Sequence, residues 1–248
     1  MKVVVIGGTG LIGSKTVKLL GEEGHEVVAA APDTGVNTLT GEGLAEALRD
    51  ADVTVDVTNA PVFEEGAVAE FFRTSTGNIL KAAKEAGVGH HVVLSIIGTE
   101  HMQDSWYLRA KQTQEDLVRQ SGVPFTIVHA AQFFEFVLGI ADMATVDGAV
   151  RLAPVRFQPA AASDIASFVA RTAAGQPVSG VVEVAGPEPL RLDETVREAL
   201  AAKGDARSVV SDPAAGYSGA AVEESTLMPG PEAHLTETSY EDWRAARH

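Results

Sequence analysis

The stretch Met1-Lys2-Val3-Val4-Val5-Ile6-Gly7-Gly8-Thr9-Gly10-Leu11-Ile12-Gly13 opens the chain and sets its fold. The unbroken apolar run from Val3 to Ile6 is typical of a strand buried on both faces in a parallel sheet. Glycines follow this run at a spacing of three, and residues 14–20 then have the pattern of a helix. A strand that turns into a helix over glycines brings bare backbone N–H groups and the positive end of the helix to one spot. Such a spot suits a pyrophosphate.

The glycines of this loop fit two frames. Gly8-x-Gly10-x-x-Gly13 matches G-x-G-x-x-G, whereas Gly7-x-x-Gly10-x-x-Gly13 uses the wider spacing. In either frame, a strand before the loop and a helix after it are the context that a dinucleotide-binding motif requires. The alternative is a glycine-rich turn that only packs a helix on a strand. We expect a dinucleotide, NAD or NADP, to be bound by the loop residues Gly7, Thr9, Gly10, Leu11, Ile12 and Gly13.

The composition narrows the class of protein. A chain of 248 residues with 45% hydrophobic residues can bury one large core, so one α/β domain is the simplest count. The 19 basic and 34 acidic side chains give a formal charge of −15, which argues against binding nucleic acid or an anionic membrane surface. The absence of cysteine excludes disulfides, thiolate metal sites and cysteine nucleophiles. The early first strand and the lack of apolar runs of about 18 residues predict a cytoplasmic protein without a signal peptide.

Strand and helix patterns alternate through the first half of the chain. Residues 25–31, 53–57, 91–97 and 125–128 have the composition of buried strands, and residues 44–49, 66–86 and 107–120 have apolar side chains at helical spacing. Strands separated by helices imply right-handed βαβ crossovers and a parallel sheet. The pattern therefore predicts a Rossmann-type α/β fold with a doubly wound parallel sheet.

The alternation loosens after residue 130. We expect helices over 132–144, 163–173 and 192–202, strands over 149–152 and 181–184, and an acidic tail that ends in a short docking helix around Tyr240 and Trp243. Ser163 and Asp164 have the residue types of an N-cap. The prediction is a single domain over residues 1–248. Its small C-terminal lobe, drawn mainly from about 131–160 and 187–248, would lie over the cofactor crevice.

Three side chains have the chemistry needed to reduce a carbonyl. Tyr107 and Lys111 are four residues apart on a predicted helix and therefore share one face, while Ser95 lies near the end of the fourth strand. Hydride transfer to a carbonyl requires a proton on oxygen, and a tyrosine whose pKa is lowered by a nearby ammonium can supply it. Lys111 would provide that charge, and Ser95 would hold the carbonyl oxygen. The alternative is an amphipathic helix with a half-buried Tyr107 and a solvated Lys111.

Together these motifs resemble the short-chain dehydrogenase/reductase superfamily. The wide glycine spacing and the phenylalanine-rich segment after the fifth strand are similar to its extended and atypical members, including the NmrA-like branch. The resemblance covers most of the first 185 residues and implies a Rossmann fold, an NAD(P) cofactor and Ser-Tyr-Lys catalysis at Ser95, Tyr107 and Lys111. It also implies that Lys111 binds the nicotinamide ribose. Asn59 and Ala60 lie where the family contacts the adenosine half of the cofactor.

The sequence favours NAD over NADP. Relatives that prefer NADP usually place an arginine after the second strand or in the glycine loop, and here those places read Ala30-Ala31-Pro32-Asp33-Thr34 and Leu11-Ile12. Asp33 follows Gly13 by twenty residues, which is about where an acidic side chain would bind a ribose 2′-OH and repel a phosphate. The alternative is that Asp33 is the turn residue of Pro-Asp-Thr-Gly.

Other polar and aromatic residues allow two interpretations each. His129 ends the fifth strand at the same rim as Ser95, so it either contacts the cofactor or substrate or is a loop histidine bonded to backbone. His90 and His91 are adjacent on a strand and point to opposite faces, so we expect no metal site there. The phenylalanines within residues 133–136 either line an apolar substrate pocket or belong to the core.

These observations predict an NAD(P)-dependent oxidoreductase that interconverts a carbonyl and an alcohol on a small organic substrate. Tyr107 would be the general acid/base, Lys111 would tune it and bind ribose, and Ser95 would orient the carbonyl. One alternative is an epimerase that uses the same three residues. Another is a non-catalytic NAD(P)-binding regulator that senses redox state. We expect a small-molecule substrate and no nucleic-acid or membrane partner. The sequence leaves the oligomeric state open, and the resemblance implies that a homodimer would pair through long helices.

Overall fold

The apolar runs of the sequence form a seven-stranded sheet in a computed structural model that describes residues 1–246. Its strands run in the order β12-β9-β5-β4-β3-β1-β2, and the pairs β1–β2, β1–β3, β3–β4 and β12–β9 are parallel. The strand bounds are β1 (Lys2–Ile6), β2 (Glu26–Ala30), β3 (Val53–Asp56), β4 (His90–Ile96), β5 (Phe125–Ala130), β9 (Gly180–Ala185) and β12 (His234–Leu235). The predicted parallel sheet is confirmed. The short, exposed strand β12 was not predicted, because His234 and Leu235 carry no strand pattern.

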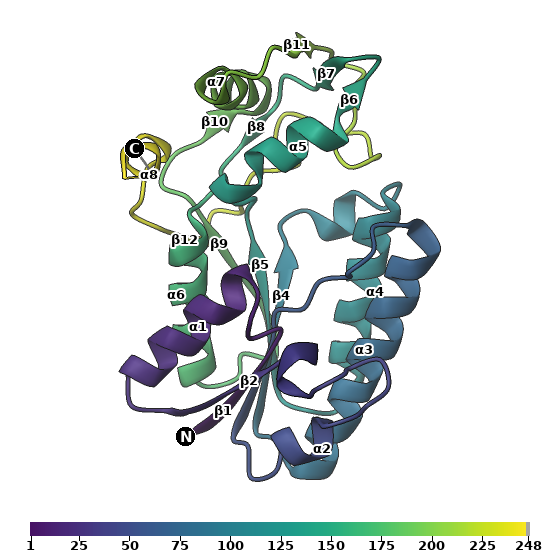
Figure 1. The fold of residues 1–248 in the computed structure, drawn as a ribbon, viewed down its shortest axis with the longest axis vertical. Coiled ribbons are helices and arrows are strands. Elements are labelled where there is room, and N and C mark those ends of the chain that lie inside the picture. Colours follow the sequence, from purple (N-terminus) through teal and green to yellow (C-terminus); the bar gives the residue numbers. More distant parts are fainter. Residues whose placement is uncertain (247–248) are drawn as a thin grey trace. The chain divides into compact units, whose positions relative to one another are not determined.

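Helices cover both faces of this sheet, as a doubly wound fold requires. Figure 1 shows α1 and α6 on one face and α2, α3 and α4 on the other. Their bounds are α1 (Leu11–Glu22), α2 (Leu44–Ala47), α3 (Glu65–Ala86), α4 (Trp106–Gln120) and α6 (Ala162–Ala174). The longest of them, α3, buries Val68, Phe72 and Ile79 at helical spacing and ends at Gly87, whose φ of +71° favours glycine.

The chain divides into two compact units. The first contains residues Met1–Ser95, Ala110–His129 and Ile165–Val182, and the second contains Ile96–Arg109, Ala130–Asp164 and Glu183–His248. In the first unit, Val3 to Ile6 of β1 are buried, as the apolar run predicts for a strand covered on both faces. The second unit takes in the two segments expected to form a C-terminal lobe, and it also includes the segment Ile96–Arg109.

The second unit is built from short elements around its own apolar core. It contains the sheets β11-β7-β6 and β10-β8, and its core includes Phe157, Leu192 and Leu227. The bounds are 3-10 helices η2 (Thr99–His101) and η3 (Phe134–Phe136), helices α5 (Val137–Met143), α7 (Leu192–Lys203) and α8 (Tyr240–Ala245), and strands β6 (Thr145–Val146), β7 (Ala149–Leu152), β8 (Arg156–Phe157), β10 (Leu190–Arg191) and β11 (Ser208–Ser211). The docking helix expected near the C-terminus is confirmed, because Tyr240 and Trp243 pack their rings on Phe134 at 5.2 and 5.4 Å.

Three helix starts differ clearly from the prediction. The helix expected over 132–144 begins only at Val137 as α5, because Phe133 is extended and residues 134–136 form the 3-10 helix η3. Helix α1 begins at Leu11 instead of Ser14, because Gly13 can lie inside the first turn against the backbone of Gly7. Helix α6 begins at Ala162, so the assignment of Ser163 and Asp164 as its N-cap is wrong. The Ala162 N–H donates to the Glu135 carboxylate at 3.0 Å, a cap from a distant segment that the local sequence does not reveal.

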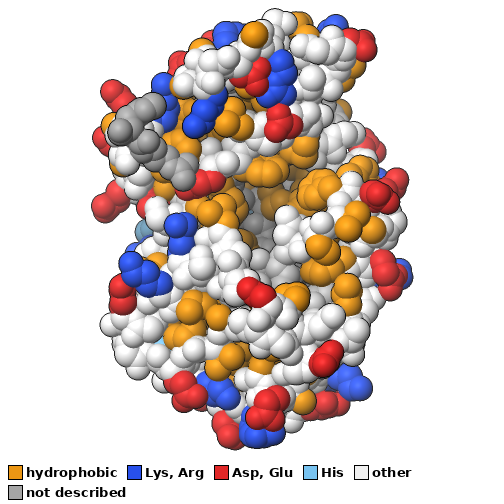
Figure 2. Space-filling model, viewed as in Figure 1, with side chains coloured by type: hydrophobic (Ala, Val, Ile, Leu, Met, Phe, Trp, Pro, Cys, Tyr) orange, Lys and Arg blue, Asp and Glu red, His pale blue; other side chains and the backbone are white. Residues whose placement is uncertain are grey.

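The surface carries charges of both signs. Figure 2 shows acidic and basic side chains interspersed on one face of the molecule, with hydrophobic side chains between them. Among residues 1–246, the structure contains no helix that combines the length and the apolar character needed to cross a bilayer.

Candidate functional site

The glycine loop is packed so tightly that its backbone leaves no room for side chains at Gly7, Gly8 and Gly13. A Cβ atom on Gly8 would lie 2.8 Å from the Val5 carbonyl oxygen and from Ala29 Cα. A Cβ atom on Gly13 would lie 2.1 Å from the Gly7 carbonyl oxygen. Gly7 has a φ of +81°, and a Cβ there would lie 3.1 Å from the Val57 carbonyl group. The Gly10 N–H closes the turn by donating to the Gly7 oxygen at 3.0 Å. Packing therefore requires glycine at Gly7, Gly8 and Gly13, so both glycine frames have a steric basis.

The start of α1 is suited to an anion. Gly10 is its N-cap residue, and within residues 1–246 no side chain caps that first turn. The N–H groups of a first turn lack partners inside their own helix and lie at its positive end. Because Gly7 directly follows β1 and packs on the segment after β3, the loop lies where the strand order reverses between β1 and β3. This is the position at which open α/β sheets bind ligands, so the loop fits the pyrophosphate of a dinucleotide.

The residues expected to contact the adenosine half lie on exposed turns of the same unit. Asp33 is in a 3-10 turn, η1 (Pro32–Thr34), directly after β2, and its carboxylate accepts a hydrogen bond from Thr9 Oγ1 at 3.3 Å. Asp33 is thus both a turn residue and a neighbour of the glycine loop. Asn59 is exposed after β3, and its side-chain oxygen accepts from the Ala60 N–H at 2.9 Å. Their contacts with the cofactor stay predictions.

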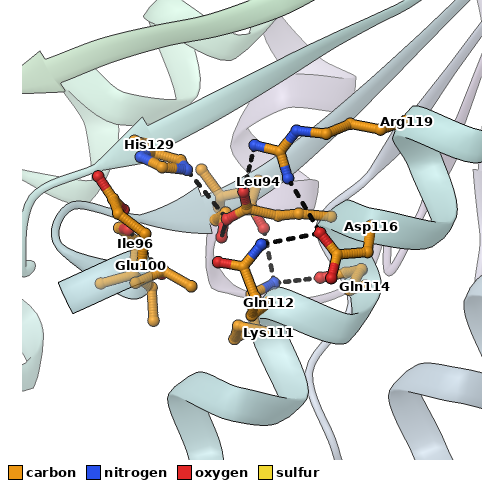
Figure 3. A network of polar contacts seen from close by, with 12 residues as sticks. Leu94, Ile96, Glu100, Lys111, Gln112, Gln114, Asp116, Arg119 and His129 are labelled. Atoms are coloured by element: carbon orange, nitrogen blue, oxygen red, sulfur yellow. Dashed lines mark hydrogen bonds and ion pairs between the residues drawn. The ribbon is translucent and has the colours of Figure 1, made fainter. Parts of the chain in front are cut away.

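Ser95 belongs to a buried network centred on Glu115. Figure 3 shows this region with His129 and Arg119 among its labelled residues. The Ser95 hydroxyl donates to Glu115 Oε1, and His129 Nε2 lies 2.9 Å from the same oxygen. Arg119 donates to the other carboxylate oxygen at 2.9 Å. Burial alone would raise the pKa of Glu115, but the hydrogen bonds from His129, Ser95 and Arg119 lower that pKa below its ordinary value.

This network is not a nucleophilic triad. In a Ser-His-acid triad the histidine accepts the proton of the serine, whereas here Ser95 and His129 both contact the carboxylate oxygen of Glu115. His129 is 4% exposed, so the structure places it inside the first unit instead of on an open rim. Its predicted contact with the cofactor stays a prediction.

Lys111 is buried instead of solvated, which contradicts the amphipathic-helix alternative at this residue. It is 3% exposed, and its ammonium donates to the Leu94 carbonyl oxygen at 2.8 Å and to Gln114 Oε1. The ring of Phe72 covers it, with 4.7 Å from Nζ to the ring centroid. Burial lowers the pKa of Lys111 to about 8, although Asp56 and Glu115 each favour its charged form.

Sequence reasoning missed the two residues that complete this network. Asp56 is fully buried at the end of β3, where it accepts from Gln114 Nε2 at 3.0 Å. Gln114 is also fully buried and bonds Lys111 through its side-chain oxygen. A carboxylate that ends an otherwise apolar strand was the available signal for Asp56. The spacing of Gln114 and Glu115, three and four residues after Lys111, was the signal for a shared helix face.

The structure places Tyr107 in the second unit. Its side chain packs against the apolar cluster that contains Met102, Leu108 and Val155. Nearby, burial raises the pKa of Tyr217, and Tyr107 raises it further. Of the three predicted catalytic residues, Ser95 and Lys111 thus belong to the first unit and Tyr107 to the second, while Tyr107 and Lys111 share helix α4.

The other side chains considered from the sequence have mainly structural partners. His90 and His91 bond Thr126 and Thr54 at 2.9 and 2.7 Å, and burial lowers the pKa of His91 to about 4. Residues 1–246 contain no group of three or more acidic or histidine side chains placed to hold a metal. In the phenylalanine-rich segment, Phe134 is buried in a core cluster, whereas Phe136 is 44% exposed.

Comparison with known proteins identifies the cofactor class. The model of a family described as NAD(P)H-binding matches residues 7–174, which is more than half of the chain. The match begins at Gly7 and covers the glycine loop, Ser95, Tyr107 and Lys111. A nicotinamide dinucleotide is therefore the group that the loop geometry and the family share.

Two curated relatives are similar over part of their length. The chain is 30% identical over 162 residues to (4-alkanoyl-5-oxo-2,5-dihydrofuran-3-yl)methyl phosphate reductase of Streptomyces griseus, covering 60% of this chain and 54% of that protein. It is 25% identical over 153 residues to the photosystem II assembly factor Ycf39 of Synechocystis, covering 56% and 47%. The chain thus spans about half the length of these relatives.

Solved structures with the same fold contain bound nicotinamide cofactors. The NADPH-dependent quinone oxidoreductase QOR2 of Escherichia coli, complexed with NADPH, superposes with a TM-score of 0.66 at 20% identity, covering 85% of this chain and 77% of that one. A dTDP-glucose 4,6-dehydratase of Streptomyces venezuelae, with NAD bound, gives 0.69 at 18% identity, covering 86% and 85%. At these identities the likeness concerns the fold, and the two structures hold different dinucleotides.

Proposed function

The chain belongs to the NAD(P)H-binding family, and from this premise we propose that it is an oxidoreductase that interconverts a carbonyl and an alcohol on a small organic molecule. In this proposal the glycine loop and the first turn of α1 bind the pyrophosphate. Asp33 binds the adenosine ribose and favours NAD, while Asn59 and Ala60 contact the adenosine half. The reduced nicotinamide would supply the hydride.

The remaining chemistry belongs to side chains of this protein. Tyr107 donates a proton to the carbonyl oxygen as charge develops there, and it takes the proton back in the reverse reaction. The ammonium of Lys111 stabilises the phenolate form of Tyr107 and bonds the nicotinamide ribose. Ser95 orients the substrate oxygen. Because the Ser95 hydroxyl donates to Glu115, its oxygen is left to accept a hydrogen bond from the alcohol form of the substrate.

The observation that carries this proposal is the burial of the Lys111 ammonium. A buried charge is costly unless it is well bonded, and Lys111 is bonded by Leu94 and Gln114 beneath the ring of Phe72. Strongly perturbed lysines of this kind cluster at functional sites. A solvated helix surface would need none of these partners.

The test compares turnover with cofactor binding. Oxidation of NADH and NADPH is measured with a panel of ketones and quinones for the wild type, Tyr107→Phe and the control Tyr240→Phe. We expect Tyr107→Phe to lower kcat by about 10² to 10⁴ with cofactor affinity unchanged, because only the proton donor is removed. Tyr240→Phe should retain the wild-type rate, since Tyr240 packs in the aromatic cluster with Phe134 and Trp243. Full activity in Tyr107→Phe would refute the catalytic assignment.

A second candidate function is a cofactor-binding protein without turnover. The observation that favours it is Ser95, which is 2% exposed and donates its hydroxyl proton to Glu115. The relative Ycf39 is described as an assembly factor, a role that its name does not tie to turnover. Tight binding of NADH or NADPH without oxidation by any acceptor in the panel would support this candidate and refute the oxidoreductase.

A further inference from the structure

One carboxylate in the first unit has two separate tasks. Asp56 Oδ1 accepts from the Thr58 N–H at 3.0 Å and from the Thr58 hydroxyl at 2.7 Å, which fixes the turn after β3. Asp56 Oδ2 accepts from Gln114 Nε2 at 3.0 Å. The carboxylate is fully buried, so each of these hydrogen bonds is made away from water.

Gln114 carries this anchoring across to α4. Its amide nitrogen donates to Asp56, and its amide oxygen accepts from the ammonium of Lys111. An amide must present its nitrogen to a carboxylate and its oxygen to an ammonium, so the two partners fix the orientation of the Gln114 side chain. With the Leu94 carbonyl oxygen as a second acceptor, two of the three Lys111 N–H bonds are directed by the protein.

The same network reaches the glycine loop. The turn that Asp56 holds is the surface on which Gly7 is packed, because a Cβ on Gly7 would lie 3.1 Å from Val57 and 3.2 Å from Thr58 Cα. A continuous path of hydrogen bonds and backbone contacts therefore joins Lys111 to Gly7. Neither Gln114 nor Asp56 is among the residues that the proposed function uses.

We propose that Gln114 is a positioning residue which, anchored on Asp56, aims the Lys111 ammonium at the nicotinamide ribose, while the same carboxylate sets the turn beneath the glycine loop. The ribose contact of Lys111 rests on the proposed function. The hold of Gln114 on Lys111 does not, since it is a property of the protein alone.

The charged groups around Lys111 make this hold measurable. Asp56 of β3 and Glu115 of α4 face the ammonium, and Phe72 of α3 presents its ring. In cofactor-free protein carrying ¹³C-labelled lysine, NMR should show one lysine with a titration midpoint near 8. Gln114→Met removes an acceptor that favours the charged form of Lys111, so the titration midpoint of this lysine should fall. Gln114→Glu adds a negative charge beside the ammonium, so its midpoint should rise.

Cofactor affinity supplies the second measurement. ADP contains the part bound by the loop but lacks the nicotinamide ribose, so the ratio of NADH to ADP affinity isolates the contact made by Lys111. Gln114→Met should weaken NADH about tenfold, the effect of one charge-assisted hydrogen bond, and leave ADP unchanged. Asp56→Asn should also lower the ratio of NADH to ADP affinity. The oxygen of the new amide can still accept from Thr58, but its NH₂ group faces the NH₂ group of Gln114, so the anchoring hydrogen bond of Gln114 is lost.

The control is Gln112→Met on the same helix, since the Gln112 side chain donates to the exposed carboxylate of Asp116, at 2.9 Å. It should leave both the lysine midpoint and the affinity ratio unchanged. If Gln114→Met also leaves both unchanged, the positioning role is refuted and Gln114 is structural. If Gln114→Met does not fold, the opposite shift expected for Gln114→Glu decides. If the Gln114 variants shift the lysine titration midpoint as expected, but the wild type binds NADH no tighter than ADP, only the ribose contact is refuted.

Discussion

The glycine loop and the polar face of α4, formed by Lys111, Gln114 and Glu115, lie in the same unit but depend on opposite properties. The loop can adopt its tight turn because its glycines lack side chains. A single added Cβ at Gly13 would lie 2.1 Å from the Gly7 carbonyl oxygen. The polar face of α4 is stable because its side chains are buried and form hydrogen bonds with partners that satisfy their charges. Adding an atom to the packed loop, or removing a hydrogen-bond partner from a buried charge, should therefore destabilise the fold.

The largest effect is expected from adding one methyl group to the loop. Gly13→Ala should lower the free energy of unfolding by more than about 3 kcal/mol or abolish NADH binding, because the clash is with rigid backbone. Gly21→Ala is the matched control on the same helix, where a Cβ would meet nothing within 4 Å. Its effect should be neutral or stabilising by up to about 1 kcal/mol. Urea unfolding and isothermal titration measure both, and similar results for the two variants would remove the steric account of the loop.

The next largest effect is expected from neutralising a buried carboxylate on α4. Glu115→Gln removes the charge that holds Ser95, His129 and Arg119, and should lower the free energy of unfolding by about 2 to 3 kcal/mol at pH 7. The neighbouring Asp116→Asn removes an exposed partner of Arg119, 3.5 Å away, and should cost less than about 0.5 kcal/mol. Chemical denaturation compares them. Equal losses would mean that burial adds nothing to the value of the Glu115 carboxylate.

The next prediction concerns His91, a buried base that the fold keeps neutral because burial lowers its pKa. The unfolded chain binds a proton on His91 near pH 6.5, whereas the folded protein does so only near 4. Stability is therefore lost as the pH falls below about 6.5, by about 2 kcal/mol between pH 7 and pH 5 from this residue. His91→Gln should lose less stability over that range, and the exposed His101→Gln should behave as the wild type. Parallel acid profiles for all three proteins would contradict the assignment.

The smallest effect is expected at the edge of the loop. Asp33→Ala removes a negative charge from an exposed turn beside Thr9, so repulsion of a 2′-phosphate should weaken. We expect the ratio of NADH to NADPH affinity to fall by about tenfold or less, which corresponds to about 1 kcal/mol. Fluorescence titration with the two cofactors measures the ratio. An unchanged ratio would leave Asp33 with a turn role alone.

Steric features were accessible from the sequence, because they depend on neighbours along the chain. The apolar run of β1 and the glycine spacing predicted the strand and the loop, since their causes lie within thirteen residues. The parallel sheet followed from the regular alternation of strand and helix patterns along the first half of the chain. The start of α1 was misplaced because the space for Gly13 depends on a carbonyl six residues earlier.

Electrostatic features were less accessible, because their partners come from distant strands. Lys111 was predicted to be functional, but its burial depends on Phe72, Leu94 and Asp56, which only the fold brings together. Glu115 reads as one more polar residue of an amphipathic helix until Ser95 and His129 are placed against it. No pairing of that kind follows from spacing in one chain.

The buried Lys111 ammonium contributes to the alkaline behaviour of the protein. Its pKa is about 8 in the folded chain and 10.5 in the unfolded chain, so the unfolded state holds the proton more tightly between these values. Stability from this residue therefore increases as the pH rises through that range, by about 3 kcal/mol in the limit. Over the same range the ammonium is neutralised. For this residue, a pH above 8 therefore favours the stability of the fold, whereas a pH below 8 favours the charged form that the proposed ribose contact uses.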